Sequence, residues 1–265
     1  MDLIDPTAKQ CAFKKYYHYQ PFCKDYLKAT LRDRKLFCSD PLNVNDPWDC
    51  KPWFDYRPLL KDPARREDMI TFFRSVDSPE MVNHPLRPRY EDSIRNDDNE
   101  LKKALDRHSK LLAEQIGRRR IYCLTPFFDS TLMWSHYAAK HKGICLEFDK
   151  NNALIEKARP VRYSKTYPEW TLHGAAIDPL PLVLTKSIDW AYEREFRIVG
   201  SALDGPLKLH DNFVVLPEGA LTAIILGCES PDHAEVLSVV NEYGPGLPLK
   251  RAVRVPNHYK LTVKD

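Results

Sequence analysis

Residues 132–149 have the sequence LMWSHYAAKHKGICLEFD, and this short stretch carries more fold information than any other. Ser130 or Thr131 can cap a helix that begins it, Gly143 ends the turn that follows, and ICLEFD has the composition of a strand. On that strand Glu147 is expected on the face opposite its two flanking apolar residues, because side chains alternate along a strand. A segment used only for packing does not need so many side chains that bind, donate or titrate, so we expect a site here.

Composition places the chain among ordinary soluble proteins. Hydrophobic residues make up 43% and charged residues 29% of 265 positions, which is enough apolar material for a sizeable core. The net charge of +3 predicts no strong field for DNA or an acidic membrane as the main partner. The sequence also has no apolar run long enough to span a membrane, and its start, MDLIDPTAKQ, lacks the features of a signal peptide.

The cysteines indicate a reducing compartment. There are seven, an odd number, and none forms a C-x-x-C pair. We therefore expect reduced thiols in a cytoplasmic protein, with Cys38, Cys123 and Cys145 as small core residues, rather than a disulfide framework or a zinc clip.

The order of expected elements predicts an α+β fold. Short strands follow one another with helices set unevenly among them, which favours a mixed or antiparallel β-rich body over a regular doubly wound sheet. The expected strands are 13–20, 35–39, 121–128, 144–149, 161–164, 193–200, 213–216, 221–226, 250–255 and 259–263, with helices at 22–33 and 231–243. On the last helix, the apolar face is expected to carry Ala234, Leu237, Val240 and Asn241.

Residues 55–119 differ from the rest. Prolines interrupt charge-rich helical segments, and one apolar stripe runs through Leu101, Leu105, Leu112 and Ile116. We interpret this region as a helical insertion that lies over the body of a single domain spanning residues 1–265. The basic run 118–120 either contacts phosphates or complements the dipole at the end of its helix.

A second candidate site follows from the stretch WAYEREFRIV at residues 190–199. In a strand, Glu193, Glu195 and Arg197 would share one face, since they are two residues apart. Like charges this close raise one pKa and the arginine lowers it, an arrangement that suits a general base or the stabilisation of developing positive charge. The alternative is a solvent-exposed face with a cross-strand salt bridge.

Four further side chains of the first stretch are candidate ligand contacts, namely Ser135, His136, His141 and Lys142. The two histidines are five residues apart, whereas pairs that bind metal on one helix face prefer a spacing of four, so we expect no metal. Ser135 and His136 cannot act as nucleophile and base, because neighbouring helix residues do not face each other. Lys142 beside a glycine suits phosphate, although no P-loop pattern is present.

The early aromatic strand and the loop after it add two weaker signals. His18, with Tyr19 beside it, suggests a ligand contact at a pocket edge, or else a half-buried structural histidine. Asn45, Asp46 and Asp49 could hold a cation, but this composition is also typical of turns.

Several of these segments together resemble an uncharacterised bacterial family, a domain of unknown function with a W-S-H-Y-A-x-x-H-K-G signature. The matching pieces occur in order across residues 13–263, and they are KKYYHYQ, LFCSDPLNVNDPWDC, LMWSHYAAKHKGICLEFD, WAYEREFR and IILG. This resemblance brings no activity with it.

A looser resemblance is to ADP-ribosyltransferases, through an aromatic strand with a histidine, a short strand ending in serine, and a late Glu-x-Glu pair. It implies that NAD is the substrate, that His18 holds the adenosine-side ribose and that Tyr137 packs near nicotinamide. Glu195 would be the catalytic carboxylate and Glu193 would position an acceptor, which would be nucleic acid or protein. The chain departs from that family in lacking the usual S-T-S strand and in having the 55–119 insertion.

We therefore expect an intracellular NAD-cleaving enzyme, an ADP-ribosyltransferase or NAD glycohydrolase, of the kind used as bacterial toxins or phage-defence effectors. One alternative is a nucleic-acid-binding or nuclease-like defence protein, based on the basic run 118–120, Lys140, Lys142 and the many aromatics, with a divalent cation on Asp46, Asp49 and Glu147 in the nuclease form. The other is a non-catalytic sensor or interaction module, in which the aromatics of the WSHYA helix would be core.

Overall fold

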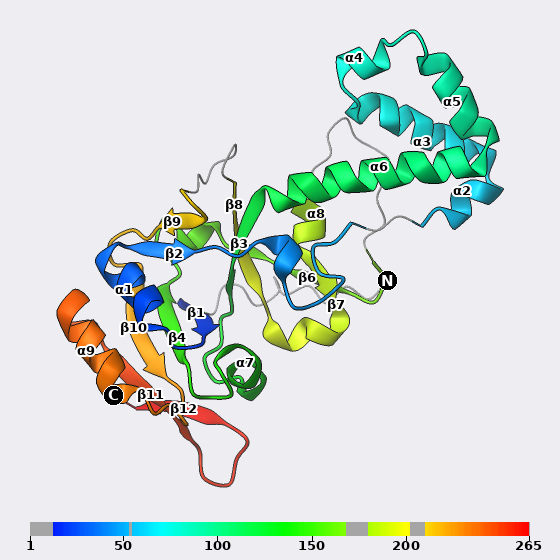
Figure 1. Cartoon of the computed structure of the whole chain (residues 1–265). Coiled ribbons are helices and arrows are strands. Elements are labelled where there is room, and N and C mark those ends of the chain that lie inside the picture. The colour runs from blue at the N-terminus through cyan, green and yellow to red at the C-terminus, as the bar shows by residue number, and fades with distance from the viewer. Residues whose placement is uncertain (1–12, 53–54, 168–179, 202–209, 265) are drawn as a thin grey trace.

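The computed structural model describes residues 13–52, 55–167, 180–201 and 210–264, and the fold is α+β, as expected (Figure 1). The start of the chain, including MDLIDPTAKQ, lies outside these residues. Five strands form the largest sheet, and its order is β1 (Lys15–Gln20), β4 (Ile144–Asp149), β10 (Leu221–Leu226), β11 (Leu249–Arg254) and β12 (Leu261–Lys264). The sheet is mixed, because β10 and β11 pair in parallel while the other neighbours are antiparallel.

A second sheet carries one wall of the site. It has three antiparallel strands, in the order β3 (Arg119–Leu124), β8 (Phe196–Ser201) and β5 (Arg159–Pro160). Backbone hydrogen bonds between Tyr17 and Thr125 join β1 to the end of β3, so the two sheets meet beside the aromatic strand. Two smaller ladders complete the body, β2 (Lys35–Phe37) with β9 (Phe213–Val215) and β6 (Arg162–Ser164) with β7 (Thr185–Ser187).

The alternation of strand β4 separates two hydrophobic cores. Leu146 and Phe148 lie in one core with side chains of α1 (Lys24–Arg32) and α9 (His233–Tyr243). Cys145 points to the other face and packs with residues of α7 (Thr131–Tyr137), including Trp134, which is fully buried. Ser130 caps α7 by accepting a hydrogen bond from the Met133 amide, as the sequence predicted. The large sheet is therefore covered by helices on both faces.

Residues 57–117 form a helical arm. Its helices are α2 (Arg57–Lys61), α3 (Pro63–Val76), α4 (Pro79–Val82), α5 (Arg87–Asn96) and α6 (Asp98–Gly117). The expected stripe on α6 is confirmed, since all four of its apolar residues are buried. However, α6 leads away from β3 and the shorter helices pack at its far end (Figure 1), so the arm extends from the body instead of lying over it.

The expected apolar face of the last helix was wrong. On α9 the buried residues are Val236, Val239 and Val240, whereas Leu237 is 39% exposed. The buried face is thus rotated around the helix from the expected one, because the three valines are the side chains that pack in the core. In the loop at residues 40–50, Asp40 caps a short 3₁₀ turn at Pro41–Asn43.

The remaining short elements lie between β4 and β8. They are the 3₁₀ turn Ile155–Lys157, helix α8 (Leu180–Val183) and the 3₁₀ helix Ile188–Glu193. Across the described residues, no helix combines the length and the apolar character that crossing a membrane would require.

Candidate functional site

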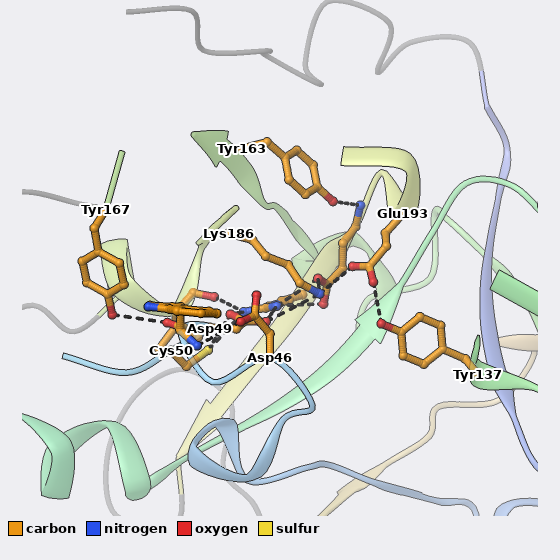
Figure 2. A network of polar contacts seen from close by, with 12 residues as sticks. Asp46, Asp49, Cys50, Tyr137, Tyr163, Tyr167, Lys186 and Glu193 are labelled. Atoms are coloured by element: carbon orange, nitrogen blue, oxygen red, sulfur yellow. Dashed lines mark hydrogen bonds and ion pairs between the residues drawn. The ribbon is translucent and has the colours of Figure 1, made fainter. Parts of the chain in front are cut away.

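A buried network of charged side chains lies where β7 and β8 meet the 40–50 loop (Figure 2). Its members are Asp49, Lys186, Glu193, Glu195 and Arg197, and each is less than a tenth exposed. Charges this deeply buried are tolerated only when they are paired and hydrogen-bonded.

Arg197 is the centre of the network. It projects from β8, and its guanidinium binds Glu195 through two hydrogen bonds, Nε to Oε1 at 2.7 Å and Nη2 to Oε2 at 2.9 Å. The same group binds Asp49 through Nη1 at 3.0 Å and Nη2 at 2.6 Å, and Nη1 also donates to the Val183 carbonyl at 2.6 Å. Two bidentate carboxylate contacts fix the guanidinium in position.

Lys186 is the second cation, and all three carboxylates lie within its reach. Its Nζ atom is 2.6 Å from Glu193 Oε2, 3.5 Å from Glu195 Oε2 and 3.6 Å from Asp49 Oδ2. Burial alone would lower the pKa of Lys186, but these three carboxylates outweigh it and the pKa is raised. Lys186 is therefore charged at every ordinary pH.

Glu193 and Glu195 titrate in opposite directions. Burial raises the pKa of Glu193 to about 7, with a further increase from the neighbouring carboxylate of Glu195. Burial would raise the pKa of Glu195 too, but Arg197 and Lys186 outweigh it and hold this pKa below its ordinary value. With all members ionised, three carboxylates face two cations, and the surplus negative charge belongs to Glu193.

The backbone brings the two glutamates together in a way that the sequence pattern did not predict. The strand does not begin at Glu193, which ends the 3₁₀ helix, but at Phe196. Arg194 adopts a left-handed conformation with φ of 46°, and this reversal directs both carboxylates towards Lys186. The amide of Glu195 is held by the hydroxyl of Tyr163 at 2.8 Å.

Tyr137 connects the network to helix α7. Its hydroxyl donates to Glu193 Oε1 at 2.5 Å, on the side of that carboxylate away from Lys186 (Figure 2). Burial, followed by the charge of Glu193, raises the pKa of Tyr137, so the phenol stays protonated and donates. This bond joins the WSHYA segment to the WAYEREFR segment.

One cavity of about 480 Å³ opens onto this network. It brings together most of the residues singled out from the sequence, which are His18, Tyr19, His136, Tyr137, Glu193, Glu195 and Arg197. They come from three separate segments of the chain, so the tertiary fold and not the sequence order creates the cavity. Its size is within the range of small-molecule sites.

His18 presents an acceptor to this cavity. Its Nδ1 donates to the Cys123 carbonyl at 2.7 Å, since a carbonyl oxygen can only accept, and its ring stacks on Tyr122 at 4.3 Å. Burial lowers the pKa of His18, partly opposed by that hydrogen bond, so the ring is neutral at neutral pH. The lone pair then resides on Nε2, which is suited to bind a hydroxyl group.

Three predicted residues lie outside the cavity lining, and these are Ser135, His141 and Lys142. Ser135 Oγ lies 3.0 Å from His141 Nε2, and the His141 ring stacks on Trp134. Ala139, Lys140 and His141 all have positive φ angles between 48° and 67°, an uncommon run for residues with side chains. This part of the signature shapes a tight loop.

That loop is fixed by close backbone contacts. A Cβ atom on Gly227 would lie 2.0 Å from the His141 carbonyl oxygen, and one on Gly143 would lie 2.3 Å from the Gln20 carbonyl oxygen. The Gly227 amide donates to the Gly143 carbonyl at 2.9 Å. The loop therefore docks directly on the strands that border the cavity.

Sequence reasoning missed Lys186 altogether and misread Asp49. Lys186 lies in a three-residue strand with no motif around it. The one feature of the sequence that could have indicated its burial is its position between two apolar segments. Asp49 was considered as a cation ligand, but it pairs with Arg197. Glu147 pairs instead with Lys15 and Lys250 across the large sheet, and within the described ranges no group of acidic, histidine and cysteine side chains could hold a metal.

The cysteines and the basic run can also be placed. Cys38 and Cys145 are buried as expected, Cys123 is partly buried, and the six cysteines among the described residues are all free thiols. Arg120 donates to Asn212 Oδ1 at 2.6 Å and to the Gly117 carbonyl at 2.6 Å, so part of the basic run supports local structure.

Comparison with known proteins gives one match. Residues 133–198 match the family described as "Protein of unknown function (DUF2971)", a span that includes both motif segments except their end residues Leu132 and Val199. The expected resemblance to an uncharacterised domain family is thereby confirmed. Searches of curated proteins and of solved structures each found no match.

Proposed function

We propose that the protein is an NAD-cleaving enzyme of the ADP-ribosyltransferase type. The observation that carries the proposal is the cavity of about 480 Å³, which His18, Tyr137 and the Glu193–Glu195 pair line together. Those are the residues to which the resemblance gives the roles of ribose binding, nicotinamide packing and catalysis. A non-catalytic module would not need a buried, surplus carboxylate beside an open cavity.

The charge balance of the network suits this reaction. When the glycosidic bond breaks, its electron pair leaves with nicotinamide and positive charge develops on the ribose. A fixed group of opposite charge stabilises that state, most strongly where water is excluded. With three carboxylates and two cations, the network supplies one surplus negative charge next to the cavity.

Glu193 and Glu195 have different roles in the proposed reaction. Both oxygens of Glu195 are held by Arg197, so this group contributes a fixed charge. Glu193 is held less fully, by Tyr137 and Lys186, and its pKa of about 7 allows proton exchange near neutral pH. The acceptor, whether water or a group on nucleic acid or protein, adds to ribose C1, and its proton passes to Glu193.

A neighbouring cavity provides room for the rest of the nucleotide. This second cavity, of about 270 Å³, shares His18 with the first and extends towards α1 and β2, where Tyr26 and Phe37 line it. With His18 Nε2 bound to the adenosine-side ribose, the base would lie among these aromatic rings and nicotinamide would lie beside Tyr137. The two cavities thus match the two ends of NAD.

The test is nicotinamide release from NAD by the purified chain. Release is expected from the wild type and from Lys142→Gln, an exposed residue outside the cavity. Glu193→Gln and Glu195→Gln should each lower the rate roughly 100-fold or more, as for the loss of other electrostatic groups of an active site. No release by the wild type, together with no thermal stabilisation by NAD, would refute the proposal and favour nucleic-acid binding.

A further inference from the structure

The helical arm contains a second hollow, far from the charged network. The side chains that line it come from α4, α5 and α6, the helices of the arm labelled in Figure 1, and its volume is about 320 Å³. Arg87, Tyr90 and Arg107 line it, and Met81 and Leu86 add apolar surface at its rim. Nothing in the proposed NAD chemistry uses these residues.

Unpartnered donors gather in this hollow. Among the described residues, five buried side-chain nitrogen and oxygen atoms have no hydrogen-bond partner, and four of them belong here. They are Arg87 Nη2, Tyr90 Oη, and Arg107 Nε and Nη2. Buried donors without a protein acceptor are unfavourable, so their clustering favours the binding of an acceptor here.

Arg87 is held rigidly in place. The residue is 7% exposed, its Nε donates to Glu91 at 2.6 Å and its Nη1 donates to Asp77 at 2.5 Å. These two carboxylates fix the guanidinium plane, which leaves Nη2 as the one unused nitrogen. A preorganised arginine of this kind loses little conformational freedom when it binds an anion.

Three arginines share two carboxylates beside the hollow, while a third carboxylate, that of Glu80, lies in its lining. Three guanidinium groups, from Arg74, Arg87 and Arg107, face the carboxylates of Asp77 and Glu91. Arg107 reaches Asp77 only at 3.9 Å, outside hydrogen-bonding distance, and its side chain is 39% exposed. It can therefore turn towards a ligand without breaking a hydrogen bond.

The Tyr90 ring contacts both of the guanidinium groups that carry an unused nitrogen. The central carbon of Arg87 lies 5.7 Å from the centre of the Tyr90 ring, and that of Arg107 lies 5.1 Å from it. An anion bound beside the hydroxyl would therefore lie close to both guanidinium groups.

We propose that this hollow binds the phosphate group of a phosphate ester. Four donor atoms on three side chains suit an oxyanion with several oxygens, and the Nε and Nη2 edge of Arg107 fits two of them. The hollow is larger than a phosphate ion and has an apolar rim, so the ester carries an organic part. The ester is a free nucleotide or a nucleotide unit of a nucleic acid.

Calorimetric titration of the full chain at low salt tests this proposal, with inorganic phosphate, AMP and a short single-stranded oligonucleotide as probes. We expect AMP or the oligonucleotide to bind more tightly than inorganic phosphate, and the tighter of the two identifies the source of the ester. Arg107→Gln should weaken binding about ten-fold or more, as expected when a hydrogen bond to a charged group is lost. Tyr90→Phe should also weaken binding, and it removes a hydroxyl that has no partner, so the fold is retained.

Arg89→Gln is the matched control. Arg89 is an exposed cation on α5, the helix that carries Arg87 and Tyr90, and it does not line the hollow. This variant should bind like the wild type. AMP binding that survives both Arg107→Gln and Tyr90→Phe would place the nucleotide elsewhere, for example in the cavity beside Glu193, and would overturn the proposal. Failure of all three probes to bind the wild type, or binding of inorganic phosphate alone, would overturn it as well.

Discussion

Replacement of Lys186 by methionine tests the charge balance of the buried network directly. The side chain is 4% exposed and its ammonium lies within 3.6 Å of three carboxylates. Methionine keeps most of the side-chain volume but removes the charge. Among the described residues of the network, Arg197 would then be the one cation left to balance three carboxylates.

The expected loss of stability is large. Removing one partner of a buried ion pair typically costs about 3–5 kcal/mol, since the other partner stays buried and uncompensated. Here three carboxylates lose a partner, so we expect a loss in the upper half of that range at neutral pH. Glu193→Gln in the same chain removes the surplus carboxylate, and the double variant should recover at least about 1 kcal/mol of that loss.

Urea unfolding followed by far-UV circular dichroism measures both effects, for the wild type, the two single variants and the double variant at pH 7.5. Lys165→Met provides a control, because Lys165 is a nearby exposed lysine on the loop after β6. A loss below about 1 kcal/mol in Lys186→Met would refute the reasoning, as would a double variant in which the changes of the two single variants simply add. Either result would mean that the network relaxes or admits water when the cation is removed.

Two further predictions concern stability. Because the pKa of Glu193 is raised from 4.5 to about 7 in the folded protein, its contribution to stability is full below pH 4.5 and is lost as the pH rises to about 7. At about 1.4 kcal/mol per pH unit the change is roughly 3 kcal/mol. The unfolding free energy of the wild type, relative to that of Glu193→Gln, should therefore fall by about this amount between pH 4.5 and pH 8, and a rise would contradict the prediction. Gly227→Ala should cost about 1–3 kcal/mol in thermal or urea unfolding, because its Cβ would lie 2.0 Å from the His141 carbonyl. Gly244→Ala, whose Cβ would meet only the flexible Leu31 side chain at 3.2 Å, should cost clearly less, and equal losses would count against this explanation.

The sequence predicted the elements of the fold well because their signals are local. Ser130 as a cap, Gly143 as the end of a turn and the period of ICLEFD all depend on neighbours within a few residues, and the helix and strand occur where they were expected. The apolar stripe of α6 was equally visible, since it repeats over the whole helix. The buried face of α9 was missed because it depends on which side chains contact the core, and the other core residues are distant in the sequence.

The site was harder to predict because long-range contacts build it. The pattern Glu-x-Glu-x-Arg correctly indicated that these side chains lie together. We expected a continuous strand to bring them together, but the strand begins only at Phe196. A left-handed Arg194 after a 3₁₀ helix brings the glutamates together, and Lys186 and Asp49 complete the network from other segments. No periodicity marks a lysine or an aspartate that will meet an arginine only after folding.

The mixture of aromatic and titratable residues in the two motifs follows from their shared interface. Tyr137 binds Glu193, while the ring of His136 packs 6.5 Å from Trp190 and 6.2 Å from Tyr192. Trp134 and the His141 loop hold α7 against the sheet on its other side. The signature thus combines two tasks within ten residues, since one set of side chains anchors the helix and the other faces the cavity. A substitution in the first set should act through stability and one in the second through chemistry, so the two sets can be separated by measuring unfolding and nicotinamide release on the same variants.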